Sequence, residues 1–130
     1  QAKEFTNKRI LLVEDNAINM EIAKMILSQS GFIVDTVENG LLAVETIKNS
    51  EVGYYNLILM DIQMPVMDGY EATKQIRNLE NKELANIPIL AMTANAFKED
   101  EENCLKAGMQ AHIAKPIDVN DMLKKISQYI

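Results

Sequence analysis

The sequence predicts an α/β fold in which a parallel β-sheet is covered by helices on both faces. Short apolar runs typical of buried parallel strands recur along the chain, and helical patterns alternate with them five times. A charged or polar residue stands at the end of four of these runs. Because right-handed crossovers join parallel strands, five strand-helix units fit a single sheet with helices on its two sides.

The expected strands are short and almost entirely apolar. Such runs are typical of strands that are buried on both faces of a sheet, as in parallel α/β folds. The runs that predict strands lie, in chain order, at residues 9–14, 32–36, 56–61, 87–92 and 110–114.

The expected helices fill the intervals between these runs. The first places its large aliphatic side chains on one face and is ended by Gly31. Asn39–Gly40 is interpreted as a turn before the second, and Asp68 as the cap of the third. The last begins after Asp118, a good N-cap, and has the cleanest helical period of the chain. The expected helices lie at residues 17–30, 41–49, 69–79, 97–107 and from 119 to the end of the chain.

Composition and charge narrow the class of protein. A chain of 130 residues with 48% hydrophobic and 25% charged residues fits one globular domain. The net charge of -6 argues against nucleic acid or an anionic membrane surface as the main partner of this domain. It suits cation binding or a basic protein surface. We see no internal repeat and no low-complexity segment.

The cysteine count indicates the cellular compartment of the protein, and the polar start of the chain indicates where the domain begins. A single cysteine, Cys104, allows no internal disulfide, which favours a reducing, cytoplasmic compartment. No apolar run approaches the roughly 20 residues needed to span a bilayer. Residues 1–8 have no apolar core of the signal-peptide kind and are interpreted as a linker remnant, with the domain at residues 9–130. We therefore expect the domain to be cut from a longer protein.

Five polar side chains are expected to meet at one edge of the sheet. Glu14 and Asp15 follow the first strand, Asp61 and Thr93 close the third and fourth, and Lys115 follows the fifth. In open α/β sheets, ligands bind at the carboxyl ends of the strands. Three carboxylates, one hydroxyl and one ammonium group at this edge predict a site for a divalent cation and a phosphoryl group.

Four segments carry a resemblance to a known family. They are Leu-Val-Glu-Asp-Asn at 12–16, Met-Asp-Ile-Gln-Met-Pro-Val-Met-Asp-Gly at 60–69, Ala-Met-Thr-Ala-Asn-Ala at 91–96 and Lys-Pro-Ile at 115–117. Together they resemble the receiver domain of two-component response regulators, most closely those fused to hybrid sensor histidine kinases. The resemblance implies a flavodoxin-like, doubly wound (βα)5 sheet with strand order 2-1-3-4-5, an order that periodicity alone does not give.

The resemblance also implies roles for the polar residues. Asp61 would be the phosphoacceptor nucleophile. Mg²⁺ would be held directly by Asp15, Asp61 and the backbone carbonyl of Gln63, and through water by Glu14. Oxygen donors of this kind are the ligands that Mg²⁺ prefers. The domain would then catalyse its own phosphorylation and dephosphorylation.

Two further roles concern the transferred group and the switch. Lys115 can reach a phosphoryl oxygen as a flexible point charge, and the hydroxyl of Thr93 can donate a hydrogen bond to another. Thr93 is expected to couple phosphorylation to His112, which stands where the family often carries a tyrosine or phenylalanine that changes rotamer. A metal-ligand role for His112 is disfavoured because no second histidine or cysteine stands nearby.

The partners implied are a phosphohistidine-bearing kinase domain and a histidine phosphotransfer domain. They are expected to dock beside the first helix, at Ile18 and Asn19. No contact with nucleic acid or membrane is expected for this domain, which should be a monomer in isolation. The domain is expected in the cytoplasm, and the resemblance allows a parent protein anchored in the inner membrane.

Several alternatives stay open. A stand-alone response regulator or the receiver of a transcription factor fits the same residues, although the chain holds no basic helix-turn-helix. A magnesium-dependent phosphatase of the aspartyl-phosphate type would want a second acid where Gln63 stands. A binding module that is never phosphorylated is disfavoured because Asp61, Thr93 and Lys115 are all present.

Overall fold

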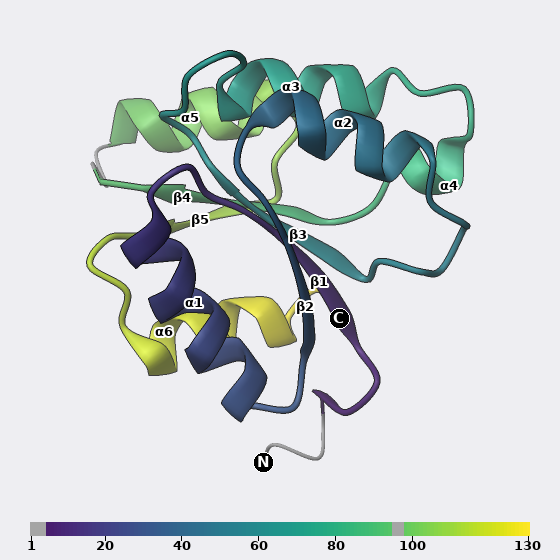
Figure 1. Ribbon diagram of the computed structural model, residues 1–130. Helices are drawn as coiled ribbons and strands as arrows, with labels where there is room; N and C mark the ends of the chain where they lie inside the picture. The colour runs from purple at the N-terminus through teal and green to yellow at the C-terminus, as the bar shows by residue number, and fades with distance from the viewer. Residues whose placement is uncertain (1–4, 95–97) are drawn as a thin grey trace.

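The chain forms a five-stranded parallel sheet with helices on both faces (Figure 1). The structure is a computed structural model and describes residues 5–94 and 98–130. The strands are β1 (Arg9–Val13), β2 (Ile33–Val37), β3 (Leu57–Asp61), β4 (Ile89–Thr93) and β5 (Ala111–Ala114). The helices are α1 (Ala17–Gln29), α2 (Gly40–Lys48), α3 (Gly69–Arg77), α4 (Lys82–Ala85), α5 (Lys98–Ala107) and α6 (Val119–Ser127).

The strand order is β2-β1-β3-β4-β5, and every neighbouring pair is parallel. The predicted α/β class and the order implied by the family resemblance are both confirmed. Every residue of the central strands β3 and β4 is buried, while the edge strand β2 is only partly covered. This pattern explains why the central runs are uninterrupted in their apolar character. Because all strands run the same way, their carboxyl ends meet at one edge.

Two helical layers enclose the sheet. Helices α1 and α6 cover one face, and α2, α3 and α5 cover the other (Figure 1). Successive strand residues point to opposite faces, so Leu59 packs in the core with Leu27 and Ile126, whereas Ile58 packs in the core with Ile47. Among the helices in the described ranges, none combines the length and the apolar character that crossing a bilayer requires.

The element boundaries agree with the sequence predictions to within one to three residues, with one change of interpretation. Asn39 and Gly40, expected as a turn, are the N-cap and first residue of α2. The Asn39 side chain accepts a hydrogen bond from the Leu42 N–H at 2.9 Å, which satisfies one of the free donors of the first turn. The expected start of the fourth helix, at residue 97, lies outside the described residues.

Helix α4 is not predicted by the sequence pattern. It is a single turn of four residues, capped by Asn81, whose side chain accepts from the N–H groups of Glu83 and Leu84. Its end is tied to α3 by Arg77, whose half-buried guanidinium donates to the carbonyl oxygens of Ala85, Ile87 and Gly108 at 2.6, 2.8 and 2.9 Å. These carbonyls lie at or just beyond the ends of α4 and α5, where backbone carbonyls have no partner within the helix. Burial lowers the pKa of Arg77.

The packed part of the chain begins before the first strand. Phe5 is 9% exposed and stacks on Phe32, with ring centroids 4.5 Å apart. The Lys8 N–H donates to the Phe5 carbonyl at 3.1 Å, which turns the chain into β1. One residue of the segment interpreted as a linker remnant therefore contributes to the core.

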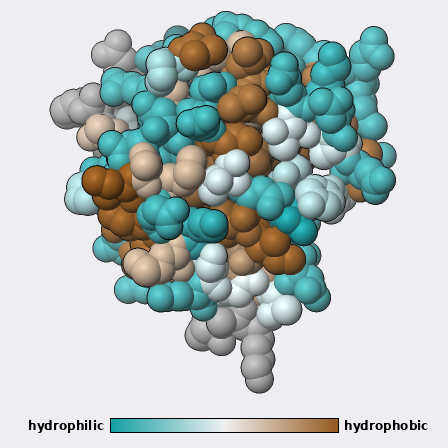
Figure 2. Space-filling model, in the orientation of Figure 1, coloured by the Kyte–Doolittle hydropathy of each residue, from teal (hydrophilic) through white to brown (hydrophobic). Residues whose placement is uncertain are grey.

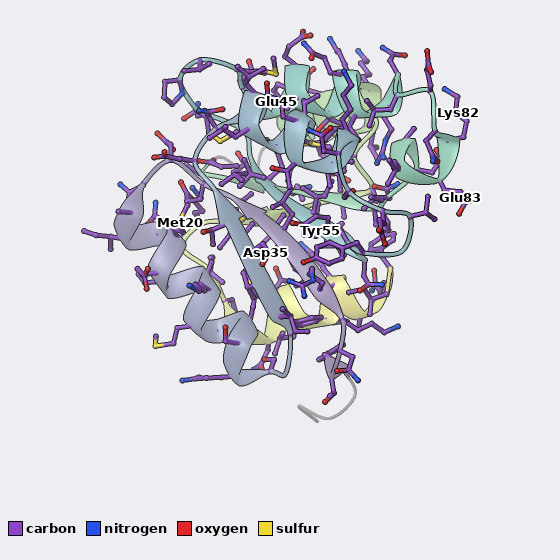
Figure 3. The ribbon with its side chains drawn as sticks, turned by 45° about the vertical axis from the view of Figure 1, so that its right-hand side comes forward. Met20, Asp35, Glu45, Tyr55, Lys82 and Glu83 are labelled. Carbon is purple, nitrogen blue, oxygen red and sulfur yellow. The ribbon has the colours of Figure 1, made fainter. Side chains whose placement is uncertain are left out.

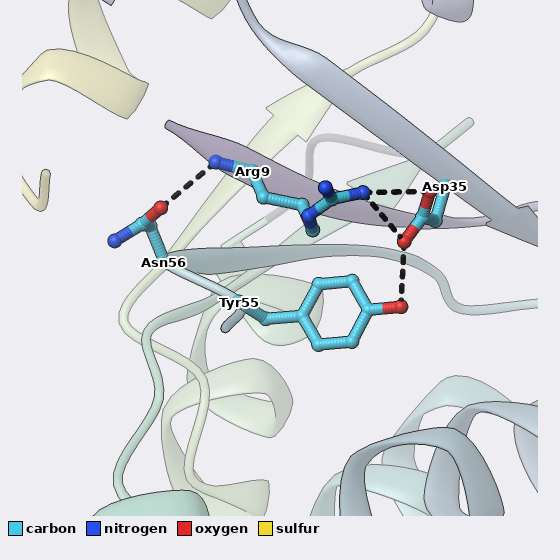
Figure 4. Close-up of polar contacts among 4 residues, drawn as sticks. All are labelled: Arg9, Asp35, Tyr55 and Asn56. Atoms are coloured by element: carbon cyan, nitrogen blue, oxygen red, sulfur yellow. Dashed lines mark hydrogen bonds and ion pairs between the residues drawn. The ribbon is translucent and has the colours of Figure 1, made fainter. Parts of the chain in front are cut away.

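A polar network closes the sheet at the edge opposite the strand carboxyl ends. The Nη1 atom of Arg9 donates to both carboxylate oxygens of Asp35, at 3.1 Å to each. The Tyr55 hydroxyl donates to the same carboxylate at 2.8 Å (Figure 4). Burial, the hydrogen bond to Asp35 and its charge raise the pKa of Tyr55. Figure 3 shows Asp35 and Tyr55 facing one another near the centre of the view, while Lys82 and Glu83, the first two residues of α4, lie apart from them. The network joins β1, β2 and the start of β3, and so fixes the strands that carry the acidic residues.

Candidate metal and phosphoryl site

The predicted polar residues do meet at the carboxyl edge of the sheet. Glu14 follows β1, Asp61 ends β3, Thr93 ends β4 and Lys115 follows β5. They line a cleft of about 220 Å³ together with Asp15, Asn16, Asn19, Ile62, Gln63 and Ala94. Loops from four neighbouring strands therefore build one small polar cleft, as the sequence predicts.

Three carboxylates form the acidic part of this cleft. Glu14, Asp15 and Asp61 each place one carboxylate oxygen within 4.8 Å of the others. Glu14 is 2% exposed and Asp61 is 5% exposed, whereas Asp15 faces the solvent. Hard oxygen donors at this spacing, with one side open to water, fit a divalent cation that keeps several waters.

Lys115 lies between the two buried carboxylates. Its Nζ atom is 2.9 Å from Glu14 Oε1 and 3.3 Å from Asp61 Oδ1. Glu14 also accepts a hydrogen bond from the Asn16 N–H at 3.2 Å. The ammonium group thus offsets part of the charge of the acidic pair.

The environment separates the proton affinities of the two buried acids. Burial, followed by the hydrogen bond and charge of Glu14, raises the pKa of Asp61 to about 7, against the opposing effect of Lys115. Burial also acts to raise the pKa of Glu14, but its hydrogen bonds with Lys115, Asp61 and Asn16 lower it overall. Burial acts to lower the pKa of Lys115, and the two carboxylates raise it overall. Without a metal, Asp61 therefore keeps a proton up to near neutral pH while Glu14 stays ionised beside Lys115.

Thr93 and Gln63 complete the cleft from its two sides. Thr93 is 8% exposed, and its carbonyl accepts from the Lys115 N–H at 2.8 Å, which fixes the two residues side by side. Gln63 stands in the loop between β3 and α3 and is exposed. The loop begins at Ile62, whose N–H donates to the Met92 carbonyl at 3.2 Å.

Of the residues expected at the switch and at the docking surface, Thr93 and Asn19 line the acidic cleft, whereas His112 and Ile18 do not. His112 lines a separate cavity of about 210 Å³ with Cys104, Leu105 and Lys125, and its carbonyl accepts from Lys125 Nζ at 2.9 Å. Asn19 lines the acidic cleft, whereas Ile18 is 72% exposed beside it. The structure thus brings Asn19 to the cleft and leaves His112 on the α5 side of the sheet.

Asn16 also lines the cleft, although no role was expected for it from the sequence. Its side chain caps α1 by accepting from the Asn19 N–H at 3.0 Å, and its own N–H contacts Glu14. An asparagine directly before a helical pattern is a recognisable N-cap signal. Its contact with the carboxylate two residues earlier is visible only in the fold.

Comparisons with known proteins identify the family. The model of the response regulator receiver domain matches residues 10–127, and the chain belongs to this family. It is 38% identical to "Probable histidine kinase 1" of Oryza sativa subsp. indica and 46% identical to "Hybrid signal transduction histidine kinase B" of Dictyostelium discoideum. These matches cover 94% and 89% of this chain but only 15% and 6% of the two relatives. The chain is thus homologous to the receiver domains of hybrid histidine kinases and spans a small part of such proteins.

Solved structures give the same result. The receiver domain of the sensor histidine kinase PA1611 from Pseudomonas aeruginosa is 40% identical, with a TM-score of 0.83 over 94% of this chain and 96% of that chain. That structure has a magnesium ion coordinated in its active-site cleft. The Saccharomyces cerevisiae complex of the phosphotransfer protein Ypd1 with the receiver domain of Ssk1 matches at 33% identity and a TM-score of 0.86, over 96% of this chain and 90% of the matched chain.

Proposed function

We propose that the domain accepts a phosphoryl group from a phosphohistidine onto Asp61. The observation that carries this proposal is the place of Asp61. It is buried at the end of the central strand β3, with the ammonium group of Lys115 at 3.3 Å and two more carboxylates beside it. A carboxylate in this position can act as a nucleophile only where its own charge and the charge of the phosphoryl group are both offset. Lys115 supplies part of that offset.

Magnesium would supply the rest. We assign its ligands to Asp15, Asp61 and the Gln63 carbonyl, with Glu14 acting through water. When bound, the ion neutralises charge on the phosphoryl oxygens. The cleft supports this assignment because its acidic oxygens lie within 4.8 Å of one another. The magnesium-bound relative from Pseudomonas aeruginosa, at 40% identity, supports it further.

The remaining steps fall to the side chains of the cleft. An Asp61 oxygen forms a bond to phosphorus while the bond between phosphorus and the imidazole nitrogen of the donor breaks, and the imidazole keeps the electron pair. Lys115 would move from the carboxylates to a phosphoryl oxygen, and Thr93 would donate its hydroxyl hydrogen bond to another. Positioning and charge thus account for the catalysis once Asp61 has lost its proton, to water or by displacement when the ion binds.

A covalent labelling experiment tests this proposal. With magnesium and acetyl phosphate, the domain should gain one acid-stable, base-labile phosphoryl group, measured by intact mass. Asp61→Asn should gain none, and chelation of magnesium should prevent labelling of the wild type. Undiminished labelling of Asp61→Asn would reject Asp61 as the acceptor.

We further propose that a kinase domain and a histidine phosphotransfer domain dock on α1. Ile18, Ile22 and Met25 follow one another at helical spacing and are 72%, 44% and 55% exposed. Figure 2 shows hydrophobic surface over the start of α1, at the left of the view. Asn19 continues this surface into the acidic cleft. A helix laid on an apolar strip with a polar rim fits a transient contact, and the Ypd1 complex of the yeast relative supports this partner class.

The docking proposal is tested by comparing two kinds of donor. Ile18→Glu should slow phosphoryl transfer from a phosphohistidine protein and leave labelling by acetyl phosphate unchanged, because only the first needs docking. Leu105→Glu is a matched control, since Leu105 is 56% exposed on α5. Equal slowing of both reactions in Ile18→Glu would show a structural role and reject the interface.

We also propose that the domain is part of a hybrid sensor histidine kinase. The relatives at 38% and 46% identity favour a hybrid sensor histidine kinase over a stand-alone regulator. Cys104 is buried and is the single cysteine of the sequence, which is compatible with the cytoplasmic setting expected from the sequence. Sequencing the gene on both sides of this segment tests the origin: a histidine kinase core in the same reading frame is expected, and a DNA-binding domain would contradict it.

A further inference from the structure

The first turn of α2 touches the loop between β3 and α3 through its backbone. The Gly40 N–H donates to the Met67 carbonyl at 3.2 Å. A Cβ atom at position 40 would lie 2.5 Å from the same oxygen and 3.2 Å from the Asp68 carbonyl. Side chains essentially never approach backbone so closely, so glycine is required here by contact. Any larger residue at position 40 must displace the loop or the helix.

The loop itself is held in an uncommon conformation. The Met67 N–H donates to the Pro65 carbonyl at 2.8 Å, which closes a three-residue turn around Val66. Val66 has a φ of 71°, a left-handed value that a β-branched residue rarely adopts. Its side chain is 77% exposed, so packing of that side chain does little to stabilise the turn. Such a conformation persists only where neighbouring contacts impose it.

Two backbone contacts fix the loop: one joins its two ends, and the other holds Met67 within it. The Gly69 N–H donates to the Ile62 carbonyl at 2.8 Å, which closes the base next to Asp61. The Gly40 contact fixes the far side at Met67. Gln63 lies between these anchors, and its carbonyl is one of the magnesium ligands assigned above. Only three residues separate Met67 from Gln63, so the contact with Gly40 lies close along the chain to the assigned ligand.

We infer that Gly40 is a positioning residue for the magnesium site, acting through Met67 on the loop that presents the Gln63 carbonyl. This inference rests on the proposed function. It makes α2, a helix with no side chain in the cleft, part of the support of the site. It also gives a role to the Asn39–Gly40 pair, since Asn39 caps the turn that presents the Gly40 N–H.

The test compares two glycine variants in metal binding and in loop structure. Gly40→Ala is expected to weaken magnesium binding about tenfold, the usual effect of disturbing a residue that supports a ligand, with shifted NMR amide signals for Gln63 and Met67. Gly53→Ala is the control: Gly53 has a φ of 86° and no atom within 4 Å of its Cβ position, so its change should lower stability but leave the metal affinity unchanged.

A second variant covers the case in which Gly40→Ala fails to fold. Asn39→Ala removes the cap of the same turn without a clash and should weaken magnesium binding by about threefold. Magnesium affinities equal to that of the wild type in the folded variants, with unshifted Gln63 signals, would overturn the role of Gly40. A wild-type domain that neither binds magnesium nor accepts a phosphoryl group would instead reject the proposed function.

Discussion

Replacing Asp61 by asparagine is expected to change how the stability of the metal-free domain depends on pH. Burial and the neighbouring Glu14 raise the pKa of Asp61 from 3.8 to about 7 in the folded state. Between these values the folded domain retains a proton that the unfolded chain has released. The free energy of unfolding therefore falls as pH rises through this window and becomes level above it.

The size of this effect follows from the same two values. The difference between 3.8 and about 7 is roughly 3 pKa units. At about 1.4 kcal/mol per unit, this gives an upper limit of about 4 kcal/mol. We expect about half of it, roughly 2 kcal/mol, because the titration of Asp61 is coupled to that of Glu14 and the cleft is open to water. Asp61→Asn has no carboxyl group that titrates at this position, so its free energy of unfolding should not show this fall. The variant should therefore become more stable than the wild type as pH rises.

Urea unfolding in the presence of a chelator measures this difference. The gap between Asp61→Asn and the wild type should widen by about 2 kcal/mol from about pH 4 to about pH 8. Asp118→Asn is the control for the loss of one exposed negative charge, since asparagine can also cap α6. If the curves of the wild type and Asp61→Asn ran parallel, the raised pKa of Asp61 would be refuted.

Three further changes test other parts of the structure. Arg77→Met should lower the free energy of unfolding by about 3 kcal/mol, because three main-chain carbonyls lose a cationic donor; a loss below about 1 kcal/mol in urea unfolding would show that the contact is replaced by water. Lys115→Met should destabilise the metal-free domain at neutral pH, because Glu14 and Asp61 lose their cation. Calorimetry should show that magnesium raises the stability of this variant more than that of the wild type, and an equal gain in both would contradict this. Thr93→Ala should still accept a phosphoryl group but show smaller NMR shift changes around β5 and α6, and changes as large as in the wild type would reject Thr93 as the coupling residue.

The strands and the site could be predicted from the sequence for one shared reason. Strands buried on both faces must be apolar along their whole length, so the places where polar residues resume mark the strand ends. Glu14, Asp61 and Lys115 stand at three such places. Their meeting in one cleft follows from the parallel sheet, whereas the order of the strands required the family resemblance.

The parts that could not be predicted depend on tertiary contacts. Helix α4 has four residues, too few for a helical period, and is stabilised by the contact of Arg77 with its end. Asn39–Gly40 fits a turn as well as a capped helix, and the contact with Met67 is formed only in the fold. The cavity that His112 lines with Cys104 and Lys125 is built from β5, α5 and α6, so its existence follows only from the packing of these three elements.

The central claim, that Asp61 is the residue that accepts the phosphoryl group, is tested most directly by locating the modification. After reaction with magnesium and acetyl phosphate, reduction with borohydride converts an aspartyl phosphate into homoserine, which peptide mapping by mass spectrometry can place. We predict homoserine at position 61 and only there, lost when magnesium is chelated. Homoserine at Asp15 or at another acid, with an unmodified residue 61, would contradict the account.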